Sequence, residues 1–272
     1  MTLAEDQIHD HGFQKISDYI WSPNLNDTYV ASVVKQFPHL KVVNKDTPPG
    51  DGIIFIGMAQ IIEDIYQQLP REGNYTVIHR PSDRSYTKAM HIIKPDSVKR
   101  VFSVNAAVDE VTAIPFGTNS ISGHDHTLER VAYEPFSMSE DTKIYCRYNV
   151  NRSGYTQERI DSIPALQTKP FVKVVTQQVD SLTFMREVKA HPFTMSLQGC
   201  GKDCARTWAA ITLGSIPIVT DCPEMRRFEG LPMVFCPPLS ELTEDWLTQA
   251  ECVRNNPIDQ ARMSYWTKII KS

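Results

Sequence analysis

Residues 191–219 read HPFTMSLQGCGKDCARTWAAITLGSIPIV, and the pattern of these residues indicates the fold class. The apolar residues at 193–197 predict a buried strand, which a turn with two glycines follows. The run over 204–213 has the length and composition of a helix, and Gly214 is placed to end it. Residues 216–219 are apolar again and predict the next buried strand. A strand, a helix and a second strand in this order indicate an α/β fold with a parallel sheet.

The same alternation continues on both sides of this stretch. Further strands are predicted at 53–57, 75–78, 100–104, 111–115, 143–148 and 171–175, with helices at 58–68, 157–162 and 181–190. Residues 119–141 are rich in Ser, Asp, Glu and Pro and are typical of a connection. The pattern therefore predicts two parallel α/β lobes in tandem, 1–139 and 140–256. A last amphipathic helix is predicted over 257–270, and this C-terminal segment, 257–272, is expected to pack back on the first lobe.

Composition and charge place the chain among globular proteins. Its 272 residues are 41% hydrophobic and 22% charged, which excludes the fibrous and disordered classes. The formal net charge of -4 argues against general attraction to nucleic acid or to an anionic membrane. The acidic N-terminus lacks an apolar signal region, and no apolar run is long enough to span a bilayer. A cytoplasmic protein without a membrane partner is therefore expected.

The six cysteines all lie in the second half of the chain, and reduced thiols are expected in the cytoplasm. Three of them, Cys200, Cys204 and Cys222, do not follow a CxxC spacing and have no histidine close in sequence. The sequence therefore predicts no metal site.

The turn between the predicted strand and helix carries the clearest chemical signal. Exposed amides at the start of a helix bind anions, and glycine lets a phosphate approach the backbone. Lys202 and Arg206 add positive charge there. The turn departs from the dinucleotide fingerprint GxGxxG, because residue 204 is cysteine, and it is not a Walker loop. It predicts a diphosphate site, unless the turn needs its glycines only for their backbone angles.

Residues 191–219 also resemble the exostosin-like glycosyltransferases, whose sequence reads roughly FxLSPxGxGxDxxRTWEALxLGxIPIV in this region. The run FEGLPMV at 228–234 resembles their YEGLPVV, and SELT at 240–243 fits the segment that follows. Weaker similarities are YNVN at 148–151 with Arg159, IPFG at 114–117 and VIHRPSD at 77–83. The similarity is densest over residues 181–247 and thin before residue 75.

The resemblance implies a GT-B fold, in which two Rossmann-like lobes with parallel sheets face a cleft. It implies that the C-terminal lobe holds a nucleotide-diphosphate sugar and that the N-terminal lobe receives the acceptor. It further implies an inverting transfer without a metal or other cofactor, in which helix amides and basic side chains neutralise the leaving diphosphate.

The donor-binding residues implied by this resemblance lie on the C-terminal lobe. They are Ser196, Gly199, Gly201, Lys202, Asp203, Arg206, Thr207, Arg147, Asn149 and Glu229. Arg206 is assigned to the diphosphate, with a surface salt bridge as its alternative. Asp203 is expected mainly to cap the helix, and Trp208 is expected to lie in the core.

The N-terminal lobe supplies the candidate base and the acceptor contacts. Asp83 is favoured as the general base and His79 is the alternative, since both follow a predicted strand. Asp83 could instead pair with a neighbouring arginine. The acceptor contacts are assigned to Asn105, Arg80 and Arg84.

One position departs from the family pattern. The family has Glu after the Trp, where the carboxylate binds the donor ribose, and this chain has Ala209. Glu229 or Glu224 could take over that contact, or donor binding could be weaker or catalysis lost.

We therefore expect a glycosyltransferase of bacterial, phage or viral type, which acts as a monomer or homodimer. A phage or viral enzyme would be located in the cytoplasm of its host. The acceptor is a glycan, or a hydroxylated base in phage DNA that the basic residues within 71–100 would contact. The alternatives are a non-catalytic nucleotide- or sugar-binding protein of the same fold and a Rossmann-type oxidoreductase. The missing third glycine counts against the oxidoreductase.

Overall fold

The computed structural model describes residues 2–22, 28–57, 62–80, 83–118, 124–148 and 157–272. The chain forms two compact units. The N-terminal unit comprises His9–Ile114 and Thr267–Ser272, and the C-terminal unit comprises Met1–Ile8 and Pro115–Trp266. The predicted boundary between residues 139 and 140 thus lies inside the C-terminal unit.

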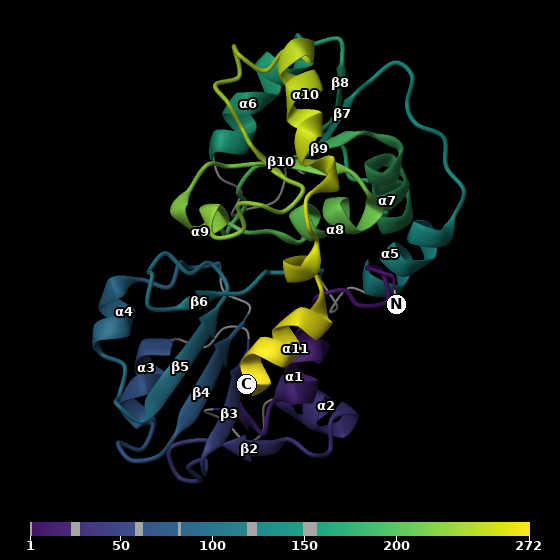
Figure 1. Ribbon diagram of the computed structural model, residues 1–272. Coiled ribbons are helices and arrows are strands. Elements are labelled where there is room, and N and C mark those ends of the chain that lie inside the picture. The colour runs from purple at the N-terminus through teal and green to yellow at the C-terminus, as the bar shows by residue number, and fades with distance from the viewer. Residues whose placement is uncertain (1, 23–27, 58–61, 81–82, 119–123, 149–156) are drawn as a thin grey trace. The chain divides into compact units, whose positions relative to one another are not determined.

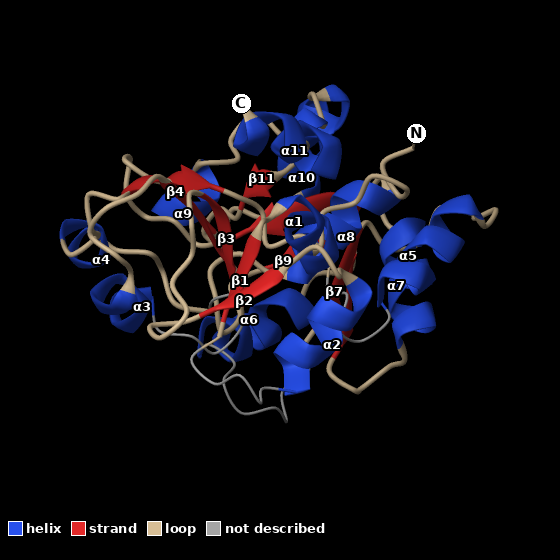
Figure 2. Cartoon of the chain, turned by 90° about the horizontal axis from the view of Figure 1, so that it is seen from below, coloured by secondary structure: helices blue, strands red, loops and turns tan. Residues whose placement is uncertain are grey.

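The N-terminal unit is built on a parallel sheet with strand order β2-β1-β3-β4-β5-β6 (Figure 1). Its strands are β1 (Tyr19–Trp21), β2 (Lys41–Val43), β3 (Gly52–Ile56), β4 (Tyr75–His79), β5 (Val98–Ser103) and β6 (Thr112–Ala113). Its helices are α1 (Asp10–Ile16), α2 (Thr28–Gln36), α3 (Ile62–Gln68) and α4 (Lys88–Ile92). The side of the sheet with α3 and α4 is opposite the side with α1 and α2 (Figure 2).

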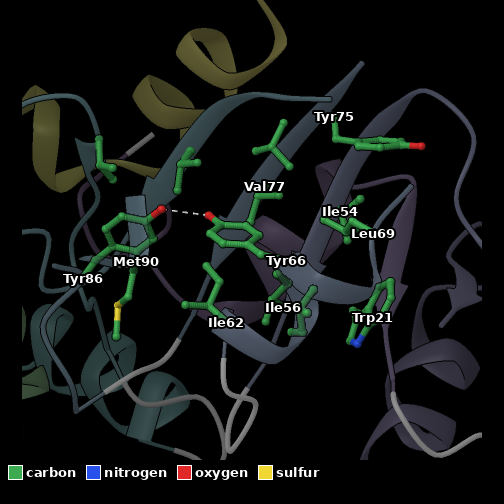
Figure 3. Close-up of a cluster of buried hydrophobic side chains, with 14 of the residues drawn as sticks. Trp21, Ile54, Ile56, Ile62, Tyr66, Leu69, Tyr75, Val77, Tyr86 and Met90 are labelled. Carbon is green, nitrogen blue, oxygen red and sulfur yellow. Dashed lines mark hydrogen bonds between the residues drawn. The ribbon is translucent and has the colours of Figure 1, made fainter. Parts of the chain in front are cut away.

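The apolar core between this sheet and α3 explains why the short helix forms. Ile62 and Tyr66 point from α3 onto the sheet (Figure 3), and with Ile65 they belong to one buried cluster that includes Val77 and other strand residues. The hydroxyl groups of Tyr66 and Tyr86 form a hydrogen bond of 2.9 Å inside this core. Burial raises the pKa of both phenols, that of Tyr86 to about 12. The pair therefore stays neutral and satisfies its own polar groups.

The C-terminal unit has a second parallel sheet, with strand order β11-β10-β9-β7-β8. Its strands are β7 (Ile144–Arg147), β8 (Val172–Val175), β9 (Phe193–Ser196), β10 (Ile216–Val219) and β11 (Val234–Phe235). Its helices are α5 (His124–Tyr133), α6 (Gln157–Gln167), α7 (Ser181–Ala190), α8 (Ala205–Leu213), α9 (Pro223–Arg226) and α10 (Glu244–Ala250). Two 3-10 helices follow, η2 (Glu251–Asn255) and η3 (Asp259–Ala261), and then α11 (Met263–Lys271).

Two apolar clusters hold this second sheet between helices. Helices α6 and α10 cover one face of the sheet, and α5, α7 and α8 cover the other (Figure 1). Side chains of α6 and α10 belong to one buried cluster, and those of α5, α7 and α8 belong to the second. Both units are therefore Rossmann-like, with parallel strands covered by helices on both faces.

The strands and helices predicted from residue 62 onward are largely present, but residues 119–141, predicted as a connection, contain the helix α5. The strand at 193–197 and the helix at 204–213 correspond to β9 and α8, and Gly214 ends α8 with a φ of 81°. The first part of the predicted helix over 58–68 lies outside the described residues. The described helices include none that is long and apolar enough to cross a membrane.

The predicted helix over 257–270 is wrong in its first half, because α11 begins only at Met263. The chain's N-terminal segment fixes this start. The Asp6 carboxylate accepts the backbone N–H of Ser264 at 2.8 Å, and the Asp6 carbonyl accepts that of Met263 at 2.9 Å. Within the N-terminal unit, the Arg100 guanidinium donates to the carbonyls of Ile269 and Ile270 at 2.6 and 3.1 Å.

Candidate functional site

The order of the strands in the C-terminal sheet marks where a ligand is expected. β7 lies between β8 and β9, so the connections that leave β7 and β9 run to opposite sides. In open α/β sheets ligands bind at such a switch point, beyond the carboxyl ends of the strands. Here those ends carry Arg147, the last residue of β7, with Tyr148 after it, and the turn 197–204 after β9.

Arg159 holds this turn in place. It is 4% exposed, and its Nε and Nη2 atoms donate to the carbonyl of Leu197 at 3.0 and 2.6 Å. A Cβ atom on Gly199 would lie 3.0 Å from Nη2 of Arg159. Neither Gly199 nor Gly201 has a positive φ, so the alternative that the turn needs them for such backbone angles is wrong. Gly199 instead leaves room for the guanidinium.

Arg206 lies in the first turn of α8 and faces the same aromatic ring as Arg159. Each guanidinium carbon is 5.4 Å from the centre of the Tyr148 ring. Nη1 of Arg206 lies 3.5 Å from the carbonyl of Met195, and its Nε is buried without a hydrogen-bond partner. Among the described residues no carboxylate pairs with Arg206, so the predicted alternative of a surface salt bridge has no support there. This guanidinium has donors to spare for an anion.

The positive charge of the site acts on a thiol at its centre. Burial raises the pKa of Cys204, but the charges of Arg159 and Arg206 and a hydrogen bond with Ser196 outweigh it and lower this pKa below its ordinary value. The Ser196 and Thr207 hydroxyls form a hydrogen bond of 2.9 Å in the interior. The surroundings of Cys204 therefore favour negative charge.

Asp203 does not cap α8, which corrects the prediction. The N-cap residue is Cys204, and it makes no side-chain capping bond. The Asp203 carboxylate instead accepts the indole N–H of Trp208 at 2.7 Å and the backbone N–H of Phe116 at 2.6 Å. Trp208 is 3% exposed and lies in the core, as predicted. Without an acidic cap, the first amides of α8 remain free of a competing side-chain anion.

A hydrogen-bonded chain links the turn to a carboxylate that the sequence analysis did not single out. The backbone N–H of Gln198 donates to the Thr220 hydroxyl at 2.9 Å, and this hydroxyl donates to Oε1 of Glu158 at 3.1 Å. The Lys202 ammonium donates to the Gln198 side chain. The sequence does not indicate a role for Glu158, because its partner Thr220 is 62 residues away.

The remaining residues that were predicted to bind the donor have different surroundings. Arg147 is half-buried at the end of β7, and Asn149 lies outside the described residues. Glu229 is exposed and forms an ion pair of 2.9 Å with Arg226. Glu224 is 5% exposed in α9.

The N-terminal unit keeps the predicted base and acceptor residues at the ends of β4 and β5. Its own switch point lies between β1 and β3, whose following residues include 23–27 and 58–61, outside the described residues. Asp83 is exposed, and Arg84 pairs with Glu63 at 3.4 Å. Asn105 is buried, with a φ of 54°.

Arg80 lies inside the N-terminal unit. It is 1% exposed, its Nε is 2.8 Å from the Asp10 carboxylate, and its guanidinium lies 4.6 Å from the centre of the Phe13 ring. These partners occupy it within the fold, which argues against a contact between Arg80 and an acceptor.

His79 is buried, and its Nδ1 is 3.0 Å from the Ser103 hydroxyl. Burial, with a smaller contribution from the charge of Arg84, lowers the pKa of His79 to about 4. An unfolded chain binds a proton at this side chain near the ordinary value of 6.5. The imidazole is therefore neutral in the folded protein at pH 7.

The pH dependence of stability is expected to report this buried imidazole. Because the folded pKa is depressed, His79 stabilises the fold fully above pH 6.5, and about 3 kcal/mol is lost as the pH falls through 6.5 to 4. His79→Gln should flatten the dependence of the free energy of unfolding on pH in this window. Urea denaturation at a series of pH values measures it, with His39→Gln at an exposed position as the control. An unchanged slope in His79→Gln would contradict the burial of a neutral histidine.

Fold and site together define a parallel α/β protein of two Rossmann-like units. At the switch point of its C-terminal sheet, Arg159 of α6 and Arg206 of α8 stack on Tyr148 beside the turn 197–204, which is called the cation-rich turn below. A scan against models of known protein families finds no match, and a search of curated proteins finds none either. The similarity to the exostosin-like glycosyltransferases stays a prediction from the motifs over 181–247.

Proposed function

We propose that this protein is a GT-B glycosyltransferase, which moves a sugar from a nucleotide-diphosphate sugar to an acceptor hydroxyl. The observation that carries the proposal is the pair of guanidinium groups on Tyr148, of which that of Arg206 has no carboxylate partner among the described residues. They lie beside the uncapped start of α8 at the switch point. A diphosphate matches two cations and a helix start without a side-chain cap.

Each group has a role in the proposed reaction. The α8 amides and Arg206 bind the diphosphate and stabilise the charge that develops on it as the bond to the sugar breaks. Arg159 keeps the turn in the geometry that presents these amides. The acceptor hydroxyl loses its proton to a base of the N-terminal unit, with exposed Asp83 preferred over buried His79. The acceptor is a glycan or a hydroxylated DNA base.

Binding of nucleotides tests the proposal directly. A ligand that binds only the folded state raises the melting temperature, so a panel of nucleoside diphosphates and nucleotide sugars, without and with magnesium, should include one that does so without the metal. In Arg206→Ala the affinity for this ligand should fall roughly 10- to 100-fold, the range of one charge-assisted hydrogen bond. Arg186→Ala is the matched control, since Arg186 is exposed on the same unit and paired with Glu134.

The outcomes separate the functional classes. A shift that Arg206→Ala reduces, together with hydrolysis or transfer of the sugar, supports the enzyme. A shift without either reaction indicates a non-catalytic binding protein. A shift with nicotinamide nucleotides alone indicates an oxidoreductase, and no shift with any member of the panel contradicts the donor site.

A further inference from the structure

Glu158 presents a carboxylate oxygen that the described protein does not satisfy. It lies in the first turn of α6 (Gln157–Gln167), next to Arg159. Oε1 accepts the Thr220 hydroxyl, whereas Oε2 is buried and has no hydrogen-bond partner among the described residues. Buried polar atoms in native proteins are nearly always hydrogen-bonded, and an orphan calls for a donor that the chain itself does not supply.

The neighbours of the Glu158 carboxylate show that it lies at the carboxyl ends of the strands of the C-terminal sheet. Thr220 directly follows β10, and it also accepts the backbone N–H of Gln198. Burial and, to a lesser extent, the negative charge of Glu158 raise the pKa of Cys236 to about 11, which places this carboxylate near the end of β11 as well. Glu158 is therefore beside the cation-rich turn, displaced toward β10 and β11.

No described cation neutralises this carboxylate. Two nitrogens of the adjacent Arg159, Nε and Nη2, donate to the Leu197 carbonyl, and none of the ion pairs among the described residues includes Glu158. An ionised carboxylate only accepts hydrogen bonds, so its missing partner is a donor such as a hydroxyl group. In a nucleotide-diphosphate sugar two groups next to the diphosphate offer hydroxyl donors, the ribose and the transferred sugar, and in a nucleoside diphosphate the ribose alone does.

We propose that Glu158 accepts hydrogen bonds from the ribose hydroxyls of the bound nucleotide and makes the site selective for ribonucleotides over 2′-deoxyribonucleotides. This inference rests on the proposed function, since it needs a nucleotide at the turn after β9. Thr220 is the positioning residue, because its hydroxyl occupies Oε1 and leaves Oε2 for the ligand. A site built to bond a hydroxyl discriminates against the analogue that lacks it.

Paired affinities test the inference. Isothermal titration is carried out with ADP, GDP, UDP and CDP and with their 2′-deoxy counterparts. For the nucleotide that binds, the wild type should prefer the ribose form roughly 10- to 100-fold. In Glu158→Gln this ratio should fall toward one, mainly through loss of affinity for the ribose form. Glu244→Gln is the matched control, since Glu244 is exposed in the first turn of α10 and should leave the ratio unchanged.

A second variant keeps the inference testable if Glu158→Gln does not fold. Thr220→Val removes the hydroxyl that orients the carboxylate while leaving the carboxylate itself, and it should lower the ratio partly. Equal affinity for both forms in the wild type, or an unchanged ratio in a folded Glu158→Gln, overturns the assignment of Glu158 alone. If no nucleotide of either form binds, the proposed donor site fails and the assignment fails with it.

Discussion

Arg159→Leu is expected to destabilise the C-terminal unit by about 3 kcal/mol and to weaken nucleotide binding. The substitution removes both donors from the Leu197 carbonyl, which then stays buried and unsatisfied, and it leaves a gap beside the Tyr148 ring. The turn over 197–204 loses the contact that sets its position, so the amides of α8 are presented less well. Urea denaturation measures the loss of stability, and titration with the nucleotide that binds wild type measures the loss of affinity.

The lysine variant and an exposed arginine provide the comparison. Arg159→Lys keeps the charge but cannot offer the same two donors to one carbonyl, so it should lie between wild type and leucine. Arg130→Leu removes an exposed arginine of α5 that pairs with Glu134 and should leave the denaturation midpoint close to that of wild type. If Arg159→Leu were as stable as the control, the guanidinium would not be what holds the turn.

The part of the fold predicted best is the part in which sequence neighbours are also neighbours in space. β9, the turn, α8 and β10 occupy one continuous stretch, and each has a local signal in apolar runs and glycines. β1 and β2 were not predicted, because each has only three residues and no pattern that distinguishes it from a loop.

Errors arise where a local signal competes with a distant partner. Asp203 has the type and position of a capping residue, but its carboxylate binds the amide of Phe116, 87 residues earlier. Arg80 follows a strand as an exposed contact would, yet its partner Asp10 is 70 residues away. Local sequence gives no information about such pairs, since they depend on which elements the fold brings together.

The sequence and the structure both point to the turn between β9 and α8 as the candidate site, but the sequence names only some of the residues that the structure brings together there. The glycine turn and Arg206 could be named, since anion-binding turns have local signatures. The orphan oxygen of Glu158 could not, because only the folded chain brings Thr220 to one oxygen of this carboxylate and leaves the other without a partner.

Ala209→Glu, which restores the residue of the resembling family, is expected to destabilise the protein by on the order of 4 kcal/mol and not to improve nucleotide binding. Ala209 is 2% exposed and lies in the apolar cluster of α5, α7 and α8, with Val188 and Leu213 among its members. A carboxylate there would lose its water without gaining a partner, and its larger side chain would overpack the cluster. Thermal and urea denaturation measure the destabilisation.

The loss of stability in Ala209→Glu is expected to depend on the position of the glutamate along α8, and Ala205→Glu tests this. Ala205→Glu adds the same charge in the first turn of the same helix, where a residue is half-exposed and the helix dipole favours an anion. It should leave stability close to wild type, so a large loss in Ala209→Glu alone comes from burial. A stable Ala209→Glu with tighter nucleotide binding would mean that residue 209 reaches the ligand, and Glu158 would then lose its role. The expected failure of Ala209→Glu instead implies that the ribose contact, absent at position 209, has to come from another element.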